Sequence, residues 1–523
     1  MAFSLSVPLP PQVPPTRPPM PTVADQLRSA RQANRWAILT EDWELLLEKW
    51  LEPRIGAERL AQWGEGDTSA NILADTCRQF STPGLYGSRP EVRHADPAAQ
   101  PMIGPEGHLD RAGLWTMMQS VQYKTFGLGD LPVFVDCTEA EGLAFQVVPP
   151  ADVWVWSTQA RPDVPVIVAW LRLYPLTVGN DTTWIYAWDT YDRGGQAAPG
   201  QPARLPSFKV LAASGDYANQ DITALVVAET PAGGFVGEDY RWTRQDGTAF
   251  LPWVFYRAVD SKQQWNIDHM LGATKGTLNG AANWTYAQHC ARDASGTAVI
   301  AAGLVPIVGN VQNAGEAGKV SSVQLSPGAI LYHQVQDGAQ PFVSEVGPGG
   351  NLEQVSAYAH GYEARQLVRL GLSAEDVEKG SADPASGAAL YISNEAKRRR
   401  AEMMRPLFER ADREMLSVCA ELLRICGLGD YPTTGYSIDY AQIPRSAEER
   451  RADREETDWS LEHGHISELD AYRQAHPGAS EEDAIAALTK AAVDAARLEA
   501  AKAQAIAAAG LTAAPVEPAT PAP

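Results

Sequence analysis

The stretch that decides the fold runs from Gly380 to Cys426 and reads GSADPASGAALYISNEAKRRRAEMMRPLFERADREMLSVCAELLRIC. It predicts a flexible loop followed by a long helix that begins near Ser386, because apolar residues recur at steps of three and four and therefore share one face. These residues are Met404, Phe408, Ala411, Met415, Val418, Leu422 and Ile425. Gly427 is expected to end the helix. Pro406 has no amide donor and predicts a kink within it.

The composition limits the class of protein. The chain of 523 residues is long enough for two or more hydrophobic cores. A formal net charge of −21 argues against a protein that grips nucleic acid through a basic surface, although it allows one that lets DNA pass. The five cysteines form no C-x-x-C pair and favour reduced thiols over disulfides. Without a signal peptide or an apolar run that could span a bilayer, the sequence predicts a soluble intracellular protein.

The N-terminal half is predicted to be a helical lead followed by an α+β region. Residues 8–22 are dense in proline and are expected to be disordered or extended. A helix is then predicted from residue 23 to Pro53, with one apolar stripe made of Trp36, Leu39, Trp43, Leu46 and Trp50. The stripe predicts packing on the helix's own domain or, alternatively, contact with a neighbouring copy of the chain.

Beta structure is predicted after a helix at 110–125. The segments rich in Val, Ile, Trp and Tyr are 132–135, 143–148, 153–156, 164–174, 183–191, 224–228 and 250–256. Turn residues separate these segments, so the region 110–257 is predicted to be α+β with an antiparallel sheet.

The second half of the chain is predicted to be mostly helical. Residues 261–292 form a helical pattern in which Gly272, Gly276 and Gly280 recur every fourth residue, which predicts a close helix–helix contact. Such a helix would span roughly 30 Å. Strand fragments in glycine-rich loops are expected up to residue 351, and a helix at 352–370. Further predictions are a strand at 436–440, helices between 444 and 467, a helix start capped by Ser467 and Asp470, and an alanine-rich helix beyond residue 480.

Catalytic motifs are weak throughout. The run Gly272-Ala-Thr-Lys275-Gly-Thr277 lacks the spacing of a phosphate-binding loop. His463, His465 and Glu468 match no common metal-site spacing and are interpreted as a surface turn at a helix end. The basic run of Lys397, Arg398, Arg399 and Arg400 indicates either a solvated helix face or a contact with DNA or a partner. No catalytic, cofactor-binding or metal site is predicted, and the chain is not expected to be an enzyme.

The order of these elements, together with Ser386-Gly387-Ala-Ala-Leu390 at the start of the long helix, resembles the portal proteins of tailed bacteriophages. In that family a similar Ser-Gly-x-Ala-Leu run precedes the long helix of the wing. The segments 458–467 and 472–484 also look like the crown-side helices of some portals. The resemblance covers roughly residues 20–500, as an order of elements more than as strict motifs.

The resemblance implies an α+β portal fold with wing, stem, clip and crown regions and a long kinked helix. It also implies a ring oligomer, usually dodecameric, at one capsid vertex of the virion, assembled in the host cytoplasm. Double-stranded DNA would pass through the ring without being tightly bound, during packaging and ejection. The expected partners are the terminase large subunit, the major capsid and scaffolding proteins, and head-completion or adaptor proteins that join head to tail. No membrane contact and no cofactor are implied.

Residue ranges follow from the same resemblance. They are 1–22 for a disordered proline-rich arm, 23–260 for the wing, 261–292 for a stem helix, 293–326 for the clip, 327–351 for a channel-loop region, 352–444 for the wing with the long helix, 445–505 for a helical crown and 506–523 for a disordered tail. Gln340, Glu345 and Asn351 are then predicted to line the channel. A second stem helix should follow the clip, but the only candidate is a short, glycine-broken run at 311–323.

Two other functions remain as alternatives. The first is another virion structural protein, such as a minor head or adaptor protein without a DNA channel, which would share the acidity but need no stem helix. The second is an enzyme with a diffuse site, such as a nuclease built on scattered carboxylates. Electron microscopy of the purified protein would separate a ring with a central hole from both alternatives.

Overall fold

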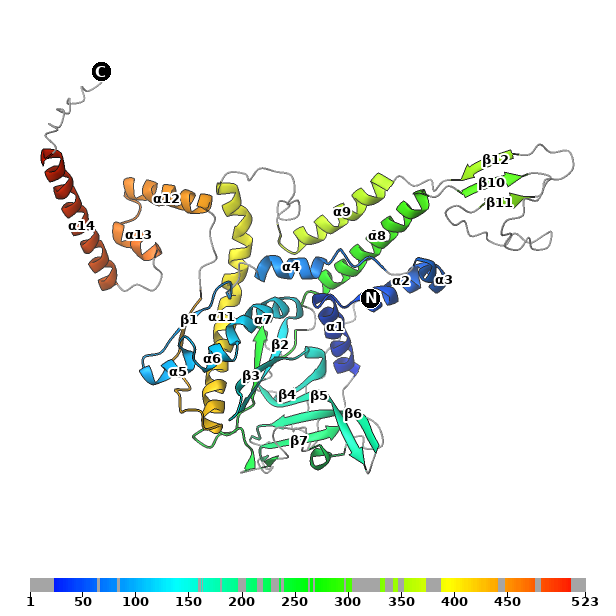
Figure 1. Cartoon of the computed structure of the whole chain (residues 1–523), viewed down its shortest axis with the longest axis horizontal. Helices are drawn as coiled ribbons and strands as arrows, with labels where there is room; N and C mark the ends of the chain where they lie inside the picture. The colour runs from blue at the N-terminus through cyan, green and yellow to red at the C-terminus, as the bar shows by residue number, and fades with distance from the viewer. Residues whose placement is uncertain are drawn as a thin grey trace, which may run out of the picture. The chain divides into compact units, whose positions relative to one another are not determined.

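The protein mixes helices and strands in two compact units (Figure 1). The computed structural model describes residues 23–508, with gaps at 64–65, 82–84, 159–160, 162, 179–180, 196–203, 214–219, 227–234, 237–238, 262–263, 267–268, 296–297, 303–329, 334–341, 347–351, 373–386, 441–446 and 476–480. One unit, called the body here, comprises residues 1–381 and 393–444. The other, called the C-terminal unit, comprises residues 382–392 and 445–523. The predicted arm at 1–22 lies outside the described residues, as does most of the predicted tail.

The N-terminal helices of the body are shorter than predicted. They are α1 (Val23–Leu39), α2 (Glu44–Ile55), α3 (Ala57–Trp63) and α4 (Ile72–Ser81). The single helix predicted to end at Pro53 is wrong, because the chain turns between α1 and α2, where Glu41 has a φ of +63°. Pro53 lies inside α2. Leu39 and Trp43 are buried in the body's core, so the apolar stripe packs on its own domain.

A group of short elements leads to the first sheet. They are β1 (Glu91–Arg93), a 3-10 turn η1 (Pro97–Ala99), α5 (Gln100–Ile103), α6 (His108–Arg111) and α7 (Leu114–Leu128). The helix predicted at 110–125 is confirmed as α7. β1 pairs antiparallel with β13 (Ser437–Asp439), which confirms the strand predicted at 436–440 and ties the two ends of the body together.

Two antiparallel sheets follow α7. The first has the order β3-β2-β9, and the second has the order β4-β5-β6-β7-β8. The strands of the first sheet are β2 (Asp130–Thr138), β3 (Gly142–Val147) and β9 (Trp253–Arg257). Those of the second are β4 (Val153–Ser157), β5 (Pro165–Val178), β6 (Asp181–Asp192), β7 (Ser207–Ala212) and β8 (Phe235–Val236). The predicted antiparallel pairing is confirmed.

The strand predicted at 224–228 is not formed in its described part, 224–226. The chain there overlaps a 3-10 turn, η3 (Thr223–Leu225). The Asp221 carboxylate accepts bonds from both the amide and the hydroxyl of Thr223, the hydroxyl at 2.5 Å. This local bonding competes with an extended ladder.

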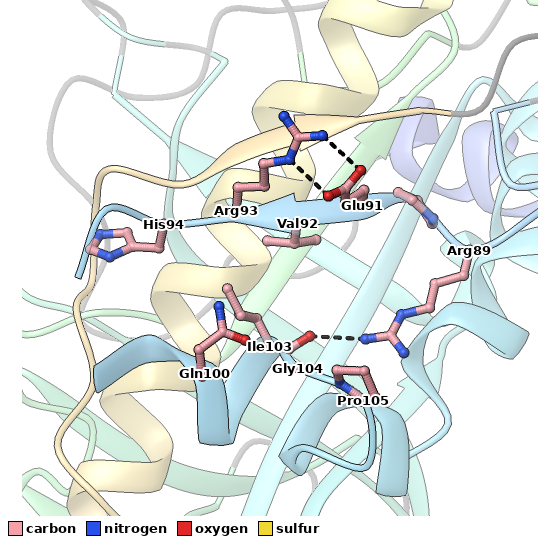
Figure 2. A pocket seen from close by; sticks show the side chains of 10 residues that line it. Arg89, Glu91, Val92, Arg93, His94, Gln100, Ile103, Gly104 and Pro105 are labelled. Atoms are coloured by element: carbon pink, nitrogen blue, oxygen red, sulfur yellow. Dashed lines mark hydrogen bonds and ion pairs between the residues drawn. The ribbon is translucent and has the colours of Figure 1, made fainter. Parts of the chain in front are cut away.

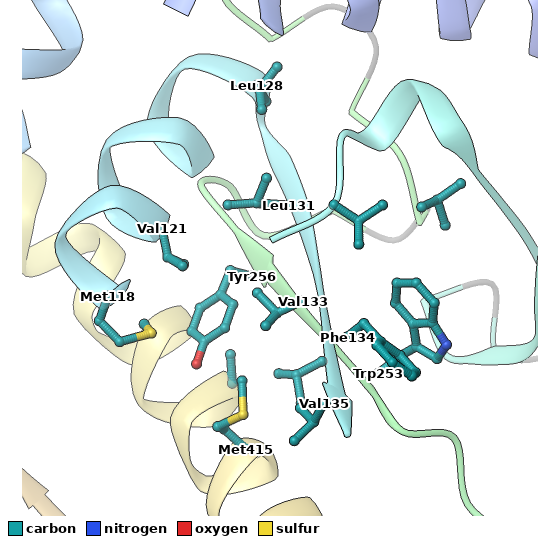
Figure 3. Packing of buried hydrophobic residues seen from close by; sticks show 14 of the residues in the cluster. Met118, Val121, Leu128, Leu131, Val133, Phe134, Val135, Trp253, Tyr256 and Met415 are labelled. Atoms are coloured by element: carbon teal, nitrogen blue, oxygen red, sulfur yellow. The ribbon is translucent and has the colours of Figure 1, made fainter. Parts of the chain in front are cut away.

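The core of the body is built in three layers. On one face of the first sheet, Met118 and Val121 of α7, Val133 of β2 and Tyr256 of β9 point toward Met415 of the long helix α11 (Gly387–Ile425) (Figure 3). That long helix, predicted from near residue 386 to residue 426, is confirmed, and Pro406 lies within it.

On the opposite face of the first sheet, aromatic side chains form the contact with the second sheet. The ring centroid of Phe134 on β2 lies 5.6 Å from that of Trp170 on β5, and 5.1 Å from that of Trp253 on β9. Tyr191 of β6 joins them at 5.7 Å from Phe134. Such tilted aromatic pairs stabilise the fold by more than the burial of their apolar area alone provides. The sheets therefore pack face to face, and α7 and α11 cover the outer side of the first one.

The remaining elements of the body come between β9 and α11. They are α8 (Leu271–Ser295), β10 (Ala298–Ala302), β11 (Ile330–His333), β12 (Phe342–Val346) and α9 (Leu352–Arg369). The helix predicted at 352–370 is confirmed. The helix predicted at 261–292 begins ten residues later than expected, after Met270, whose φ is +54°.

The C-terminal unit contains three further helices, which are α12 (Ala447–Glu462), α13 (Glu468–Ala475) and α14 (Glu481–Ala508). The capping predicted at the start of α13 is confirmed, because Ser467 Oγ accepts a bond from the Asp470 amide at 3.1 Å and donates to the Asp470 carboxylate at 2.6 Å. No helix in the described parts of the chain is both long and apolar enough to cross a membrane.

Candidate functional site: the helix pair α8–α9

The two helices on either side of the strands β10–β12 pack against each other (Figure 1). Trp284 of α8 lies edge-on to His360 of α9, with ring centroids 4.5 Å apart, and its Nε1 donates to Glu363 at 3.4 Å. Earlier in α8, Gly276 faces Gln366, later in α9. Because the partners run backwards along α9 as α8 advances, the pair is antiparallel.

Glycines on α8 provide the close approach that their spacing predicts. A Cβ added at Gly276 would lie 3.4 Å from the Gln366 side chain of α9. One added at Gly280 would lie 3.1 Å from the Ile72 side chain of α4. Gly272 differs, because nothing lies within 4 Å of a Cβ there. The predicted helix–helix contact is therefore confirmed at Gly276 and Gly280, toward two different helices, and not at Gly272.

Hydroxyl groups on α8 fix the helix to the N-terminal part of the body. Thr277 Oγ1 accepts a bond from the amide of Leu73, at 2.9 Å, and donates to its own helix. Two turns later, Thr285 Oγ1 accepts from the amide of Asp67, at 2.8 Å. Both threonines are buried. These bonds hold α8 along more than two helical turns, so its first half cannot move without breaking the N-terminal packing.

The strands between α8 and α9 form a small separate sheet with the order β11-β10-β12. β10 pairs parallel with β11 and antiparallel with β12. The predicted channel-loop region, 327–351, therefore contains two paired strands. Glu345 lies in β12, opposite Val299. Gln340, Asn351 and the short helix candidate at 311–323 lie outside the described residues.

The charge on the helix pair is nearly balanced. Lys275 is the one charged side chain described on α8, and α9 carries Glu353, Glu363, Arg365 and Arg369. The excess acid of the chain therefore does not reside on these two helices. Because acidic side chains nearly match the cations on this surface, its net attraction for phosphate is small, and phosphate neutralisation is what makes DNA binding tight.

The basic run on α11 is divided between the core and the surface. The Arg400 guanidinium lies over the Phe126 ring, 5.1 Å from its centroid, and burial lowers the pKa of Arg400. Arg399 is exposed. Lys397 and Arg398 lie in α11, but their side chains are outside the described set. Arg400 is therefore a packing residue of the body, and a DNA contact can come only from the other three.

One surface cavity, of about 540 Å³, lies beside β1 (Figure 2). Its charged lining groups are paired with each other or with nearby groups. Arg93 bonds both oxygens of Glu91, each at 2.8 Å. Arg89 donates to the carbonyl of Ile103 at 2.9 Å and pairs with Asp110. These contacts match the charged lining groups, and the ring nitrogens of His94, which also lines the cavity, lie 3.0 Å from the Thr434 carbonyl and 2.9 Å from the Asp96 amide.

The histidines near the end of α12 stack on an aromatic ring. The ring centroids of His463 and His465 lie 4.4 Å and 5.2 Å from that of Trp459. Gly464, between them, has a φ of +68°, so this is the predicted turn at a helix end. Among the residues that the structure describes, no group of three His, Cys, Asp or Glu side chains could hold a metal ion.

A buried carboxylate on α11 was not predicted. Asp412 accepts hydroxyl bonds from Tyr86 at 2.5 Å, Tyr256 at 2.8 Å and Tyr440 at 2.5 Å. Burial raises the pKa of Asp412 to about 6, while the three tyrosine bonds act in the opposite direction. The cluster joins the long helix to β9 and to the two segments that carry Tyr86 and Tyr440. The one signal in the sequence was an aspartate next to the apolar stripe.

Comparisons with models of protein families and with curated protein sequences gave no match.

Proposed function

We propose that this chain is the subunit of a bacteriophage portal ring, through which double-stranded DNA enters and leaves the capsid. The observation that carries the proposal is the unit formed by α8, the small sheet and α9. A stem helix, a clip and a second stem helix are what the portal resemblance implies in this order. Here a strut helix leads into a three-stranded sheet, and a second helix returns along the first.

The second stem helix is then α9 rather than the short run at 311–323. This differs from the assignment made from sequence, in which residues 352–370 belonged to the wing. The close approach of Gln366 to Gly276 and the ring contact between Trp284 and His360 support the pairing. The channel-facing segment was expected at 340–351; with α9 as the second stem helix, residues 373–386, which follow α9 and lie outside the described part, are a second candidate for this role.

The balanced charge of α8 and α9 also supports a passive channel. Every lysine or arginine that binds a phosphate adds affinity and would slow translocation. On this pair the cations are nearly matched by acidic side chains, and the acid of the chain as a whole repels the DNA backbone at longer range. The force would come from a separate terminase ATPase.

Electron microscopy of the purified full chain tests this function. The expected result is a population of rings with a central hole near the width of a DNA duplex. A chain that stays monomeric at all concentrations, or that forms particles without a hole, would refute the channel. The second outcome would favour the alternative, a minor head or adaptor protein.

A loop exchange tests which segment faces the channel. Residues 373–386 are replaced by a Gly/Ser linker of equal length, and the matched control receives the same exchange at 334–341. The variants are assembled into procapsids and supplied with terminase, ATP and DNA. The first exchange is expected to leave ring assembly intact and to reduce packaging, and the control to reduce it less. The reverse order would return the channel loop to the region first predicted.

A further inference from the structure

One end of the second sheet exposes an aromatic surface. Leu173 of β5 lies opposite Tyr186 of β6, and Pro175 lies opposite Trp184, so all four share one face. Trp184 is 67% exposed, Tyr186 54% and Leu173 46%. Large apolar side chains exposed side by side on a sheet commonly mark an interaction surface. This surface is called the aromatic end here.

The exposure is confined to that end. Further along the same face, Trp154, Trp156, Ile167 and Ala169 form a small buried cluster, against which Trp188 packs. The Arg204 guanidinium covers Trp156 at 5.4 Å from the ring centroid. The other face of β5 and β6 belongs to the main core. Among the described residues of β5 and β6, exposure on either face is therefore limited to the aromatic end.

The first described helix of the chain begins close to this end. Ser29 donates to the carbonyl of Ala151 at 2.8 Å, and Arg28 donates to that of Pro150 at 2.8 Å. These carbonyls immediately precede β4, whose first residue, Val153, is opposite Trp170 of β5. Because the strands are antiparallel, the chain before β4 lies at the end of β5 that continues to Leu173. The start of α1 and the aromatic end thus share one end of the sheet.

The sequence that precedes α1 has the composition that such a surface recognises. It contains prolines at 8, 11 and 14 and again at 15, 18 and 21. A polyproline II helix has three residues per turn, so each set of three falls along one edge. Arg17 is the one charged side chain between Met1 and Thr22. Proline-rich segments with this spacing dock on exposed tryptophan and tyrosine rings, because they are already extended and lose little entropy.

We propose that residues 8–21 of this chain dock on the aromatic end, against Leu173, Trp184 and Tyr186. Leu173 lies three residues, or about 10 Å, beyond Trp170 along β5. A segment of 14 residues in polyproline II geometry spans about 43 Å at about 3.1 Å per residue, which is longer than this step along the strand. Beyond Trp170, no strand in the described part of the chain pairs with β5 on the β4 side, because β4 begins at the residue paired with Trp170. The segment can therefore pass around this edge to the exposed face. The docked segment covers apolar surface that otherwise faces water.

A peptide-binding experiment tests the docking with the segment supplied as a separate molecule. A fluorescent peptide of residues 6–22 is titrated by anisotropy against the chain that lacks residues 2–21. Binding is expected, and the double variant Trp184→Ala/Tyr186→Ala should weaken it by about tenfold or more, because aromatic anchors dominate such interfaces. The matched control is Trp459→Ala, a 52% exposed tryptophan on α12, which should leave the affinity unchanged. A peptide with alanine at 11, 14, 15 and 18 should not bind.

A second measurement uses the intact chain and does not depend on the truncated one. Hydroxyl-radical footprinting read by mass spectrometry reports the oxidation of Trp184 and Tyr186 separately. Replacing the prolines at 11, 14, 15 and 18 with alanine should raise the oxidation of Trp184 and Tyr186 by about threefold or more and leave the oxidation of Trp459 unchanged. Equal oxidation with and without the prolines, or equal peptide binding to the double variant, overturns the proposal.

A different occupant would also be recognised. If a second copy covers the aromatic end, Trp184→Ala/Tyr186→Ala should change the sedimentation of the chain that lacks residues 2–21, while the peptide fails to bind. That result overturns docking of residues 8–21. The proposal does not rest on the portal function, because neither readout requires a ring or DNA.

Discussion

The substitution Asp412→Ala gives the sharpest test of how the body is held together. It removes the acceptor shared by Tyr86, Tyr256 and Tyr440, whose hydroxyls lie 2.5 to 2.8 Å from the carboxylate. Tyr86 and Tyr440 can bond each other, so about two buried donors lose their partner. Each such loss costs about 1–3 kcal/mol, and the free energy of unfolding should fall by about 2–6 kcal/mol relative to Asp412→Asn. The asparagine keeps the volume and one acceptor oxygen.

The pH dependence of the same carboxylate has a defined sign. Burial raises the pKa of Asp412 from 3.8 to about 6 in the folded protein. Its contribution to stability is therefore fully present below about pH 3.8 and is lost as the pH rises through about 6. The full amplitude is about 3 kcal/mol, of which about 1 kcal/mol falls between about pH 5.3 and pH 8. Asp412→Asn should remove this part of the pH dependence.

Urea unfolding followed by tryptophan fluorescence, at several values between about pH 5.3 and pH 8, measures both effects. The lower limit stays above the isoelectric point of about 4.9. Equal urea midpoints for Asp412→Ala and Asp412→Asn would show that the lost acceptor does not destabilise the body. A wild type that gains stability over Asp412→Asn as the pH rises would show that the pKa of Asp412 is not raised by folding.

Three further predictions concern packing and capping. Gly280→Leu should lower the free energy of unfolding by about 1–3 kcal/mol, because the added side chain would press on Ile72. Gly272→Ala, in open space, should raise the free energy of unfolding by roughly 0.5–1 kcal/mol. Thermal unfolding compares the two variants, and equal effects would contradict a close helix contact at Gly280 but not at Gly272. Arg400→Gln should lower the free energy of unfolding by about 0.5–2 kcal/mol through the lost contact with Phe126, and Arg399→Gln should lower it by less than about 0.5 kcal/mol. Urea midpoints in the opposite order would show that Arg400 does not stabilise the body. Ser467→Ala should destabilise α13 by about 1 kcal/mol, which would be seen as faster amide hydrogen exchange within Glu468–Ala475. Unchanged exchange would show that Ser467 does not stabilise the start of this helix.

Sequence periodicity and composition were enough to predict the long helices and most of the strands. α9 and α11 follow repeats of three and four residues, and β2 to β6 are rich in β-branched and aromatic residues. The errors occur where tertiary contacts override local preference. The Leu39–Trp43 step fits a helix, yet the chain turns there because both residues reach the same core through different helices. Before α8, Asp130 accepts the amide of Asn266 at 2.6 Å and holds the chain out of the helix.

Pairings between distant segments had no local signal in the sequence. β10 and β11 are adjacent in the small sheet, although 27 residues separate them along the chain. The contact between α8 and α9 depends on that return, and no pattern within either helix indicated which helix it would pack against. The Asp412 cluster was missed for the same reason, because its three tyrosines belong to elements far apart in the sequence.

The separation within that cluster has a consequence for biosynthesis. Tyr86 and Asp412 are 326 residues apart, so a ribosome adding about 5–20 residues per second needs roughly 16–65 s to make the second after the first. The first sheet is complete only once Arg257 of β9 has been made, so over the last 155 residues before Asp412 its apolar face lacks the cover that α11 provides. The nascent chain therefore presents a surface on which a chaperone could bind, and folding of the body can finish only after Tyr440 has left the ribosome.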